Sequence, residues 1–297
     1  MPIAVLVLAA GLGTRLRPLT SWLPKPLLPV GDRAALEHVL DRVRPVATTI
    51  VANAHHRAAD LRAFLEAHAP EVRVSEEARI LGTAGGLAAA ATLLGDGPVL
   101  VWNGDILASL DAAELVAAHA RAPGREATLA VRALPAGEGN VGVDAHGRIV
   151  RLRRETTREG EVRGGAFLGI HVVGEALRRV LPAEGCLVGD VYLPSLRAGK
   201  TLRTFEVGAL EWHDIGTLND YEAANAAWLA RHGGDSLVGE GAQVDPSVTL
   251  ERTIVGRGAR VEGQGRVDRC VIWPGAKATA PLSRAVVTPW GTVPFAT

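Results

Sequence analysis

Blocks of apolar residues alternate, over residues 1–231, with stretches in which apolar residues recur every three or four positions. The blocks fall at residues 3–8, 49–52, 72–74, 98–102, 127–131 and 166–173. The first of them, IAVLVL, shows no polar alternation, which is typical of a parallel strand that is covered on both faces. Between the blocks, the spacing predicts helices at residues 33–43, 57–68, 85–94, 112–121 and 218–231.

This order of elements indicates an α/β fold with a Rossmann-like, doubly wound sheet. Residues 151–163 are charged and interrupt the pattern, so we interpret them as a surface excursion. The string HGGD at residues 232–235 predicts a linker. The sequence therefore predicts one domain over residues 1–231 and a second, smaller domain over residues 236–297.

The second predicted domain repeats every six residues. Its apolar positions, with a one-residue slip after the third, are Val238, Val244, Leu250, Val255, Val261, Val267 and Trp273. Glycine and small polar residues fill the gaps, which is typical of a parallel β-helix whose coils stack on one another. A glycine-rich tail without this structure is the alternative. So short an array is not stable alone, so we expect it to pack on the first domain or on a partner subunit.

Composition limits the classes of function. Apolar residues make up 47% and charged residues 22%, which predicts a buried core rather than disorder. Lys+Arg and Asp+Glu both number 32, so no general attraction to nucleic acid or anionic membranes is expected, and any phosphate site must be local. No apolar stretch approaches the ~18 residues of a membrane span, and the first strand lacks a basic leader, so we expect a cytoplasmic protein. Cys186 and Cys270 match no metal-ligand spacing and are expected to be reduced core residues.

A glycine turn after the first strand begins the most informative string, LAAGLGTRLRPLTSWLPKPLLPV. Gly11 and Gly13 lie where missing side chains let backbone N–H groups approach phosphate oxygens. Arg15 follows, and Lys25 stands between two prolines, so the string carries a local cationic site. The third glycine of a dinucleotide fingerprint is missing, and no P-loop pattern is present.

The whole string resembles the signature of the sugar-1-phosphate nucleotidylyltransferase family, in which L-A-A-G-x-G-T-R-L-x-P-L-T is followed by P-K-P. Three further motifs occur in the family's order: LGTAGG at residues 81–86, NGD at 103–105 and WHDIGT at 212–217. The resemblance covers about residues 1–230 and implies the fold of nucleotide-diphospho-sugar transferases. The six-residue repeat is similar to the left-handed β-helix that several members carry after this domain, and within the family the chain resembles mannose-1-phosphate guanylyltransferases.

The resemblance implies an enzyme that joins a nucleoside triphosphate to a sugar 1-phosphate and releases pyrophosphate. Because both substrates are anions, holding them together and neutralising charge are the main tasks. Arg15 would bind the β- and γ-phosphates, and Lys25 the α-phosphate and the incoming phosphate; a solvated basic face is the alternative for both. Asp105 and Asp214 would hold Mg²⁺, an ion that hard carboxylates suit. By itself, Asp105 is equally compatible with a turn residue.

The nucleotide is expected to contact the glycine turn and the LGTAGG segment. The predicted nucleotide-binding residues are Leu8, Ala9, Ala10, Gly11, Gly13, Thr14, Glu77, Gly82 and Thr83. The backbones of Ala10 and Gly11 would touch the base, and Thr83 is also compatible with a helix N-cap.

Glu77 bears on the choice of base, because some relatives have at this position a glutamine that reads uracil or thymine. A glutamine both donates and accepts hydrogen bonds, whereas a carboxylate only accepts them. The edge of guanine presents two neighbouring donors, so Glu77 favours GTP. The alternative is an exposed charged loop that includes the adjacent Glu76.

The sugar site departs from the family pattern. Many members have Glu-Lys-Pro where this chain has Arg154-Glu155-Thr156, so a lysine often used near the sugar phosphate is missing. Either Arg154 compensates or the sugar sits differently. Gly142 resembles a family glycine whose backbone meets a sugar hydroxyl. The predicted sugar-binding residues are Gly142, Arg154, Glu155, Gly169 and Asp190.

Several functions remain open. Guanylyl transfer to a mannose- or heptose-type sugar 1-phosphate is favoured, and uridylyl transfer to another hexose or an N-acetylated sugar 1-phosphate is the alternative. A non-catalytic regulatory subunit should have lost Arg15, Lys25 or a metal-binding aspartate, and all are retained. A phosphocholine-type acceptor would need an aromatic or anionic cage, which 4% aromatic residues do not favour. We expect no nucleic-acid or membrane partner, and we expect a homo-oligomer contact through the tail.

Overall fold

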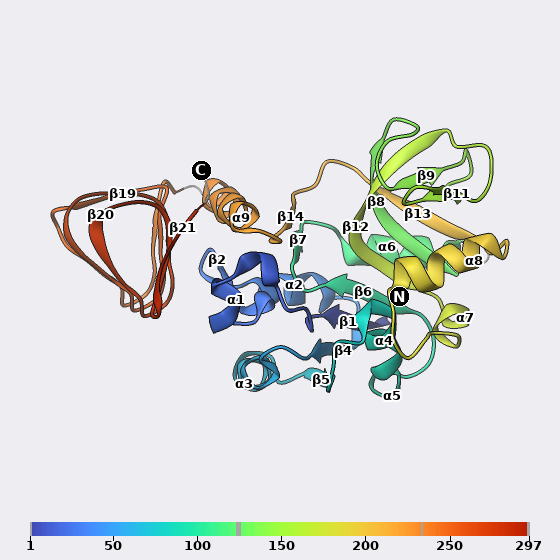
Figure 1. The fold of residues 1–297 in the computed structure, drawn as a ribbon, viewed down its shortest axis with the longest axis horizontal. Coiled ribbons are helices and arrows are strands. Elements are labelled where there is room, and N and C mark those ends of the chain that lie inside the picture. The colour runs from blue at the N-terminus through green and yellow to red at the C-terminus, as the bar shows by residue number, and fades with distance from the viewer. Residues whose placement is uncertain (1, 123–125, 233, 296–297) are drawn as a thin grey trace. The chain divides into compact units, whose positions relative to one another are not determined.

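The computed structural model describes residues 2–122, 126–232 and 234–295. Its contacts divide the chain into two compact units (Figure 1). Unit 1 comprises Met1–Gly11 and Val39–Trp212, and unit 2 comprises Leu12–His38 and His213–Thr297. The domain boundary predicted from the sequence, between residues 231 and 236, falls inside unit 2. The two predicted domains therefore differ from the two units and stay a prediction.

Unit 1 contains a large mixed sheet with the order β11-β10-β9-β12-β6-β1-β4-β5, in which β8 pairs with β12 and β13 with β8. Four neighbouring strands are parallel: β1 (Ile3–Leu8), β4 (Ala47–Ala54), β5 (Val72–Glu76) and β6 (Val99–Asn103). The long strand β12 (Arg163–Val173) runs antiparallel to β6. The remaining strands are β8 (Ala127–Leu134), β9 (Val141–Val143), β10 (Ile149–Leu152), β11 (Glu155–Thr156) and β13 (Leu202–Val207), and β7 (Ile106–Ala108) lies outside this sheet. The predicted mixed α/β fold is confirmed.

Strand β1 is the centre of the parallel part of the sheet. Val5, Leu6 and Val7 are completely buried, because β4 and β6 flank the strand and helices pack on it. The order of the strands reverses here: the chain passes from β1 to β4 and β5 on one side and returns to β6 on the other. At such a point the loops after the two neighbouring strands diverge and leave room for a ligand at the carboxyl ends. In unit 1, these are the loops after Leu8 and Asn103.

The helices of unit 1 cover this sheet. Helix α3 (Ala58–His68) packs on β5, α4 (Gly82–Ala89) and α5 (Ala91–Leu94) pack on β1, and α6 (Ala112–Arg121) packs on β8 and β12. Helix α7 (Glu175–Arg178), a π-helical turn (Leu187–Tyr192) and α8 (Leu193–Arg197) follow later in the chain. The helix predicted at residues 85–94 therefore begins earlier and is two helices. Among the described residues, no helix combines the length and the apolar character that crossing a bilayer would require.

The segment predicted as a surface excursion, residues 151–163, lies largely exposed, and it also contains the two-residue edge strand β11 and the ends of β10 and β12, which the sequence did not indicate. Several of its charged side chains form ion pairs. Arg151 donates to both carboxylate oxygens of Glu161, from Nε to Oε2 and from Nη2 to Oε1, each at 2.9 Å. This hydrogen bonding is the main cause that lowers the pKa of Glu161. Charged side chains that pair across strand ends do not interrupt a sheet.

Unit 2 contains short elements from the N-terminal part of the chain together with helix α9 (Leu218–Arg231). The short elements are the 3₁₀ turns Thr14–Leu16 and Lys25–Leu27, α1 (Leu19–Trp22), β2 (Pro29–Val30) and β3 (Arg33–Ala34). Helix α2 (Ala35–Val43) and strand β14 (Trp212–Asp214) each span a boundary between the units. A Cβ atom on Gly31 would lie 2.2 Å from the Trp228 ring, so a glycine is needed where α9 packs on this segment.

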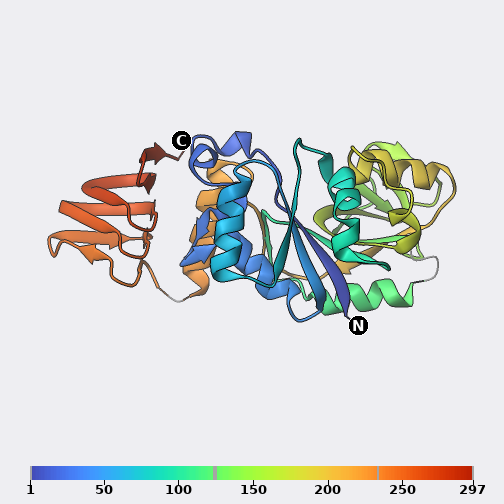
Figure 2. The same ribbon diagram turned by 90° about the horizontal axis from the view of Figure 1, so that it is seen from below.

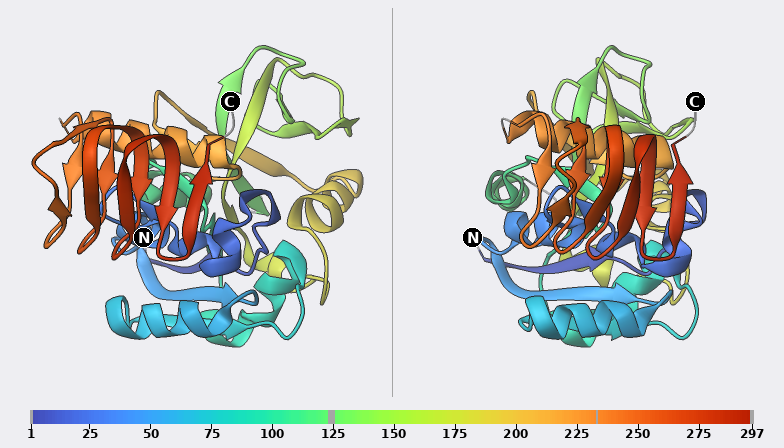
Figure 3. Two further views of the ribbon diagram at one scale, coloured as in Figure 1. Left: turned by 60° about the vertical axis from the view of Figure 1, so that its left-hand side comes forward. Right: turned by 90° about the vertical axis from the view of Figure 1, so that its left-hand side faces the viewer.

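The C-terminal part of unit 2 is a set of strands that pair mostly in parallel. The paired residues are 17 positions apart until the register shifts between Gly263 and Val267, after which β19 and β20 pair at a separation of 15. Leu237 pairs with Ile254, Gln243 with Arg260, and Arg260 with Lys277. Figures 2 and 3 show these strands, coloured orange to red, side by side in a stack. The strands are β15 (Leu237–Val238), β16 (Gln243–Val244), β17 (Val248–Glu251), β18 (Ile254–Val255), β19 (Arg260–Ile272), β20 (Lys277–Thr288) and the antiparallel β21 (Gly291–Pro294).

The predicted six-residue series describes the middle of this tail better than its beginning. Val255, Val261, Val267 and Trp273 are buried, whereas Val238 is 49% exposed. Val238 lies on the first strand, where no earlier coil covers it.

The tail packs on α9 within unit 2. Nε1 of Trp273 donates to the Tyr221 hydroxyl at 3.1 Å, and Arg284 pairs with Glu222 at 2.9 Å. Helix α9 belongs to the first predicted domain, residues 1–231, so the tail packs on that domain as expected.

Candidate functional site

The glycine turn after β1 is fixed by the side chain of Asn53, at the end of β4. Oδ1 of Asn53 accepts hydrogen bonds from the N–H groups of Ala9 at 2.6 Å and Ala10 at 3.3 Å. The carbonyl oxygen of Leu8 accepts from the N–H group of Gly104 at 2.9 Å. These backbone groups are therefore occupied within unit 1. Of the predicted nucleotide-binding residues here, Gly11 is the first whose backbone is exposed.

Asn53 is in turn held by Glu77, which follows β5. Nδ2 of Asn53 donates to Oε1 of Glu77 at 2.7 Å, and the N–H group of Leu81 donates to Oε2 at 3.0 Å. Asn53 and Glu77 are 3% and 4% exposed, so this carboxylate lies inside the protein. The alternative of an exposed charged loop does not hold: Glu77 is buried, and Glu76, which is exposed and pairs with Arg62, is the last residue of β5.

The LGTAGG segment forms the first turns of α4 and is joined to residues 185–190. Oγ1 of Thr83 accepts from the N–H group of Leu187 at 2.8 Å, and the N–H group of Ala84 donates to the Gly185 carbonyl at 2.9 Å. The helix N-cap is Leu81, not Thr83. Gly82 has a positive φ of 73°, and a Cβ atom on it would lie 2.4 Å from the Gly185 oxygen. The two segments can approach this closely only because residue 82 is a glycine.

Asp190, predicted to bind the sugar, lies on this second segment. Its Oδ2 accepts from the N–H group of Cys186 at 2.6 Å. Thr83, predicted to bind the nucleotide, and Asp190, predicted to bind the sugar, therefore lie on two segments that are hydrogen-bonded to each other.

Asp105 follows β6, at the carboxyl edge of the parallel strands, and is half-buried. The neighbouring Asn103 side chain lies against Gly169, since a Cβ atom on Gly169 would lie 2.8 Å from its Nδ2. Gly169 has a φ of 75° and falls where the pairing of β12 with β8 shifts register. The structure therefore brings Gly169 and the Asp105 loop together on one edge of unit 1.

In unit 2, the carboxylate of Asp214 lies near two cationic side chains, those of Lys25 and Arg15. Nζ of Lys25 lies 3.5 Å from Oδ1 of Asp214, and the Lys25 side chain is only 11% exposed. A Cβ atom on Gly216 would lie 2.9 Å from Nη2 of Arg15 and 3.3 Å from Oδ1 of Asp214. Two cations beside one carboxylate leave a net positive charge, which suits an anion such as phosphate.

The turn that carries Arg15 begins at Gly13, whose φ of 59° is left-handed. Oγ1 of Thr20 donates to the Gly13 carbonyl at 2.8 Å, and a Cβ atom on Gly13 would lie 2.7 Å from the Thr20 methyl group. Thr14 and Arg15 are exposed. Gly13 is thus required for the path of the chain toward Arg15.

Two predicted sugar-binding residues have structural contacts that sequence patterns did not indicate. A Cβ atom on Gly142 would lie 2.2 Å from Oε2 of Glu161 and 2.7 Å from Cβ of Arg151, so this glycine makes room for their ion pair. Glu155 accepts from Nε of Arg197 at 2.6 Å and from Nη2 at 2.5 Å, and these hydrogen bonds are the main cause that lowers its pKa.

Arg154, the candidate replacement for the missing lysine, is exposed, and the neighbouring Arg153 is the cation that reaches the Asp190 segment. Nη2 of Arg153 lies 3.5 Å from Sγ of Cys186, and a Cβ atom on Gly189 would lie 3.3 Å from Nη1. Sequence reasoning missed Arg153, because neither its left-handed φ of 57° nor its contact with Cys186 leaves a signal in the sequence.

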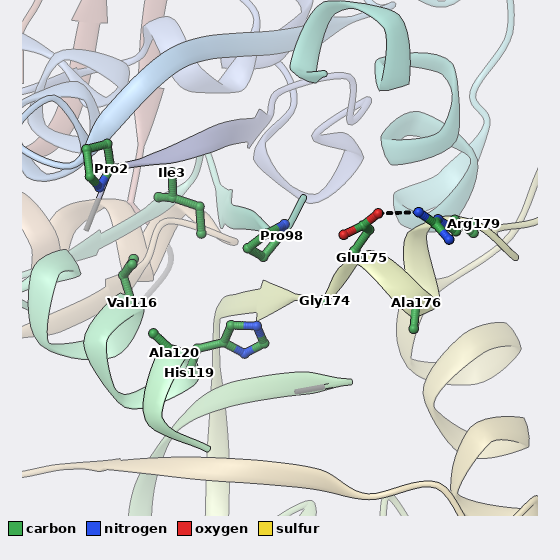
Figure 4. Close-up of a pocket in the computed structure, with 10 residues that line it drawn as sticks. All are labelled: Pro2, Ile3, Pro98, Val116, His119, Ala120, Gly174, Glu175, Ala176 and Arg179. Atoms are coloured by element: carbon green, nitrogen blue, oxygen red, sulfur yellow. Dashed lines mark hydrogen bonds and ion pairs between the residues drawn. The ribbon is translucent and has the colours of Figure 1, made fainter. Parts of the chain in front are cut away.

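A cavity of about 420 Å³ lies at the opposite edge of the sheet (Figure 4). Ile3 begins β1, Pro98 precedes β6, and Gly174 follows the antiparallel β12, so all three mark the amino-terminal ends of the parallel strands. The cavity contains none of the predicted site residues. Among the described residues, no group of three or more His, Cys, Asp or Glu side chains is placed to hold a metal ion.

Comparisons with known proteins identify the family. The family model described as nucleotidyl transferase matches residues 4–231. A mannose-1-phosphate guanylyltransferase of Mycobacterium tuberculosis is 30% identical over 262 residues, which cover 82% of this chain and 72% of that protein. An N-acetylmuramate alpha-1-phosphate uridylyltransferase of Caulobacter vibrioides is 45% identical over 111 residues, which cover 35% of this chain and 46% of that protein.

Among solved structures, HddC from Yersinia pseudotuberculosis complexed with GMP-PN has a TM-score of 0.62 and covers 76% of this chain and 99% of its own. Its sequence is 20% identical, so the similarity extends to the fold alone.

Proposed function

The chain belongs to the nucleotidyl transferase family and is a sugar-1-phosphate nucleotidylyltransferase, and we propose that it transfers a guanylyl group from GTP to a mannose- or heptose-type sugar 1-phosphate. The observation that best supports phosphate chemistry lies in unit 2, where Lys25 pairs with Asp214 and the Arg15 guanidinium lies beside Asp214 at Gly216. On a chain with no net charge, two cations beside one carboxylate provide the local attraction that an anionic substrate needs.

In the proposed reaction, an oxygen of the sugar phosphate attacks the α-phosphorus of GTP, and the bond between that phosphorus and the bridging oxygen of pyrophosphate breaks. The sugar phosphate is itself the nucleophile, so no serine, cysteine or histidine nucleophile is required. We assign Arg15 to the β- and γ-phosphates and Lys25 to the α-phosphate and the incoming phosphate. A guanidinium grips two oxygens of the leaving group, and the ammonium balances charge where it develops.

Asp105 and Asp214 are the proposed ligands of Mg²⁺. This ion usually binds through one or two carboxylates and keeps waters and substrate phosphates as its other ligands, so a cluster of three acidic side chains is not required. Both candidates offer hard oxygen atoms and are only partly buried. Bound Mg²⁺ would neutralise phosphate charge in the transition state.

The choice of GTP and mannose is supported by a relative that covers 82% of this chain and is named mannose-1-phosphate guanylyltransferase. The choice no longer depends on Glu77, because both of its carboxylate oxygens accept hydrogen bonds from the protein. Uridylyl transfer to an N-acetylated sugar 1-phosphate is the second candidate. It is favoured by the higher identity, 45% over 111 residues, to the uridylyltransferase of Caulobacter vibrioides.

A pyrophosphate-release assay with Mg²⁺ tests the proposal. It crosses GTP, UTP, dTTP, ATP and CTP with mannose, heptose, glucose, N-acetylglucosamine and N-acetylmuramate 1-phosphates. We expect the highest kcat/KM with GTP and a mannose- or heptose-type acceptor. A preference for UTP would establish the second candidate. If no pair reacts although the protein binds nucleotide, the chain is a binding subunit.

We also propose that the tail is a hexapeptide β-helix that contributes to self-association. The parallel pairing of residues 17 positions apart, from Leu237–Ile254 to Arg260–Lys277, supports coils of nearly constant length that stack on one another. Trp290 is 55% exposed although it stacks on Trp22, with ring centroids 5.9 Å apart. Light scattering should show a dimer or larger assembly that Trp290→Ser weakens; a monomeric wild-type chain would contradict the proposal.

A further inference from the structure

We propose that Glu77 is a positioning residue for the nucleotide rather than a reader of its base. Through Asn53, it holds the Ala9–Ala10 turn, so that the backbone from Gly11 onward meets the triphosphate in one fixed conformation. This inference rests on the proposed function in one respect: it takes the turn after β1 to be the nucleotide-binding loop.

The connection between Glu77 and the turn is a continuous chain of buried hydrogen bonds. Oε1 of Glu77 accepts from Nδ2 of Asn53, and Oδ1 of Asn53 accepts from the N–H groups of Ala9 and Ala10. These residues are at most 6% exposed. In a water-free interior, such bonds are strong and an unpaired group is costly, so the chain specifies one geometry.

The other oxygen of Glu77 fixes the second nucleotide-binding segment. Oε2 accepts from the N–H group of Leu81 at 3.0 Å, directly before α4 begins at Gly82. The backbone of Glu77 adds to this: its N–H group donates to the Ala54 carbonyl at 2.7 Å, and its carbonyl oxygen lies 2.9 Å from Nδ1 of His55. One carboxylate thus links the turn after β1 to the start of α4.

Gly86 is a second observation that points to this role. A Cβ atom on Gly86 would lie 2.7 Å from Nδ2 of Asn53 and 2.7 Å from Oε1 of Glu77. The helix therefore approaches the hydrogen bond between these two side chains so closely that only a glycine fits. The last glycine of the LGTAGG motif is explained by packing against Asn53 and Glu77, with no contact to a ligand needed.

The backbone of the turn becomes exposed to solvent directly after Ala9 and Ala10, the residues that Asn53 holds. Ala9 and Ala10 are 4% and 6% exposed, whereas Gly11 is exposed, and no described atom of unit 1 lies within 4 Å of the position that a Cβ on Gly11 would take. Asn53 therefore fixes the last buried residues before the backbone that is free to contact phosphate. Misplacing this backbone should weaken binding of every nucleoside triphosphate equally, whatever its base.

The first test compares Glu77→Gln with Glu76→Gln, a matched control on an exposed neighbouring carboxylate. Glutamine keeps the size of the side chain but cannot accept hydrogen bonds at both ends. We expect Glu77→Gln to raise the KM for each accepted nucleotide by about 10-fold, by the same factor for each, with kcat changed less than about 3-fold. Glu76→Gln should leave KM unchanged. A changed order of preference among the bases, or an unchanged KM in Glu77→Gln, would overturn the inference.

The second test exchanges the two groups. In Asn53→Asp combined with Glu77→Gln, the aspartate can accept from Ala9, Ala10 and the new amide, and the new amide oxygen can accept from Leu81. We expect this double variant to recover most of the nucleotide affinity that Asn53→Asp alone loses, because two neighbouring carboxylates repel each other. If Glu77→Gln alone does not fold, the double variant decides: wild-type KM values support the inference, and altered base preference overturns it.

Nucleotide affinity is also measured by calorimetry without sugar phosphate. If the wild-type chain turns over no substrate pair, the proposed function fails, but the pattern of GTP affinity across the variants still tests the inference. Equal affinity in the wild type, Glu77→Gln and Asn53→Asp would overturn it even in a fully active enzyme.

Discussion

Nζ of Lys25 lies 3.5 Å from Oδ1 of Asp214, close to the Thr217 N-cap of α9. Because the Asp214 side chain is 39% exposed, the attraction between the two should stabilise the fold by at most about 1 kcal/mol. The pair nevertheless holds a mostly buried ammonium on a carboxylate that, like the Arg15 guanidinium, lies next to Gly216. This arrangement concentrates positive charge, which matters more for binding phosphate than for stability.

We expect Lys25→Met to lower kcat by about 100-fold or more, because it removes a cation from the proposed site of charge development. The free energy of unfolding should change by no more than about 1 kcal/mol. Steady-state kinetics and urea unfolding measure the two effects. Lys200→Met, which removes an ammonium 3.9 Å from Glu126, is the control and should keep full activity. Full activity in Lys25→Met would remove this residue from the site.

Gly216→Ala should displace Arg15 without changing its charge, since the new Cβ atom would lie 2.9 Å from Nη2. We expect the KM for the nucleoside triphosphate to rise by about 10-fold, because charge-assisted hydrogen bonds depend on position. The control is Gly208→Ala, whose Cβ atom would meet no described atom within 4 Å and which should stabilise the chain by about 0.5 kcal/mol. If both variants bind nucleotide like the wild type, Arg15 does not act from this position.

The sequence predicted the centre of the sheet because burial on both faces leaves a visible signal. The uninterrupted apolar runs at β1 and β6 and the helical spacing of α3 and α6 correspond to the structure. The strands within the segment 151–163 were not predicted, because Arg151 and Glu161 are adjacent only after folding. A charged residue looks exposed in the sequence whether or not its partner lies ten positions away.

The candidate site could be predicted where a sequence motif determines the backbone conformation. It could not be predicted where side chains that are distant in the sequence contact each other in the folded protein. Gly13 and Gly82 have the positive φ angles that explain glycines in their motifs. Asn53 was missed because a single asparagine at a strand end has no spacing to mark it. Its role follows from two partners, Ala9 and Glu77, that lie 44 and 24 residues away.

The tail depends on Tyr221, whose hydroxyl accepts from Nε1 of Trp273 and donates to the Pro29 carbonyl. Tyr221→Phe leaves a buried N–H group and a carbonyl group without this partner, so the free energy of unfolding should fall by about 2–4 kcal/mol. Urea unfolding of the full chain measures this. Trp273→Phe serves for a double-mutant cycle, in which the coupling energy isolates the hydrogen bond. A coupling energy near zero would show that it contributes nothing.

His171, on β12, should make stability depend on pH. Burial lowers its pKa to about 3, and its Nδ1 lies 3.3 Å from the Tyr192 hydroxyl. In the unfolded chain a histidine has a pKa of about 6.5. Between these two values the unfolded chain binds a proton that the folded chain does not, so the free energy of unfolding falls as pH falls below about 6.5. This one group should account for a loss of about 2 kcal/mol at pH 5.

His171→Gln removes the titrating group but keeps a polar side chain near Tyr192. The test is the free energy of unfolding of both proteins from pH 7.5 to pH 5, with the slopes compared rather than the absolute values. Because the carboxylates titrate in both proteins, their effect cancels in the difference. We expect the wild type to lose about 2 kcal/mol more than the variant over this range, with the difference starting near pH 6.5. Parallel curves would mean that His171 takes up a proton in the folded protein, and that the strand β12 admits water or a new partner at this position.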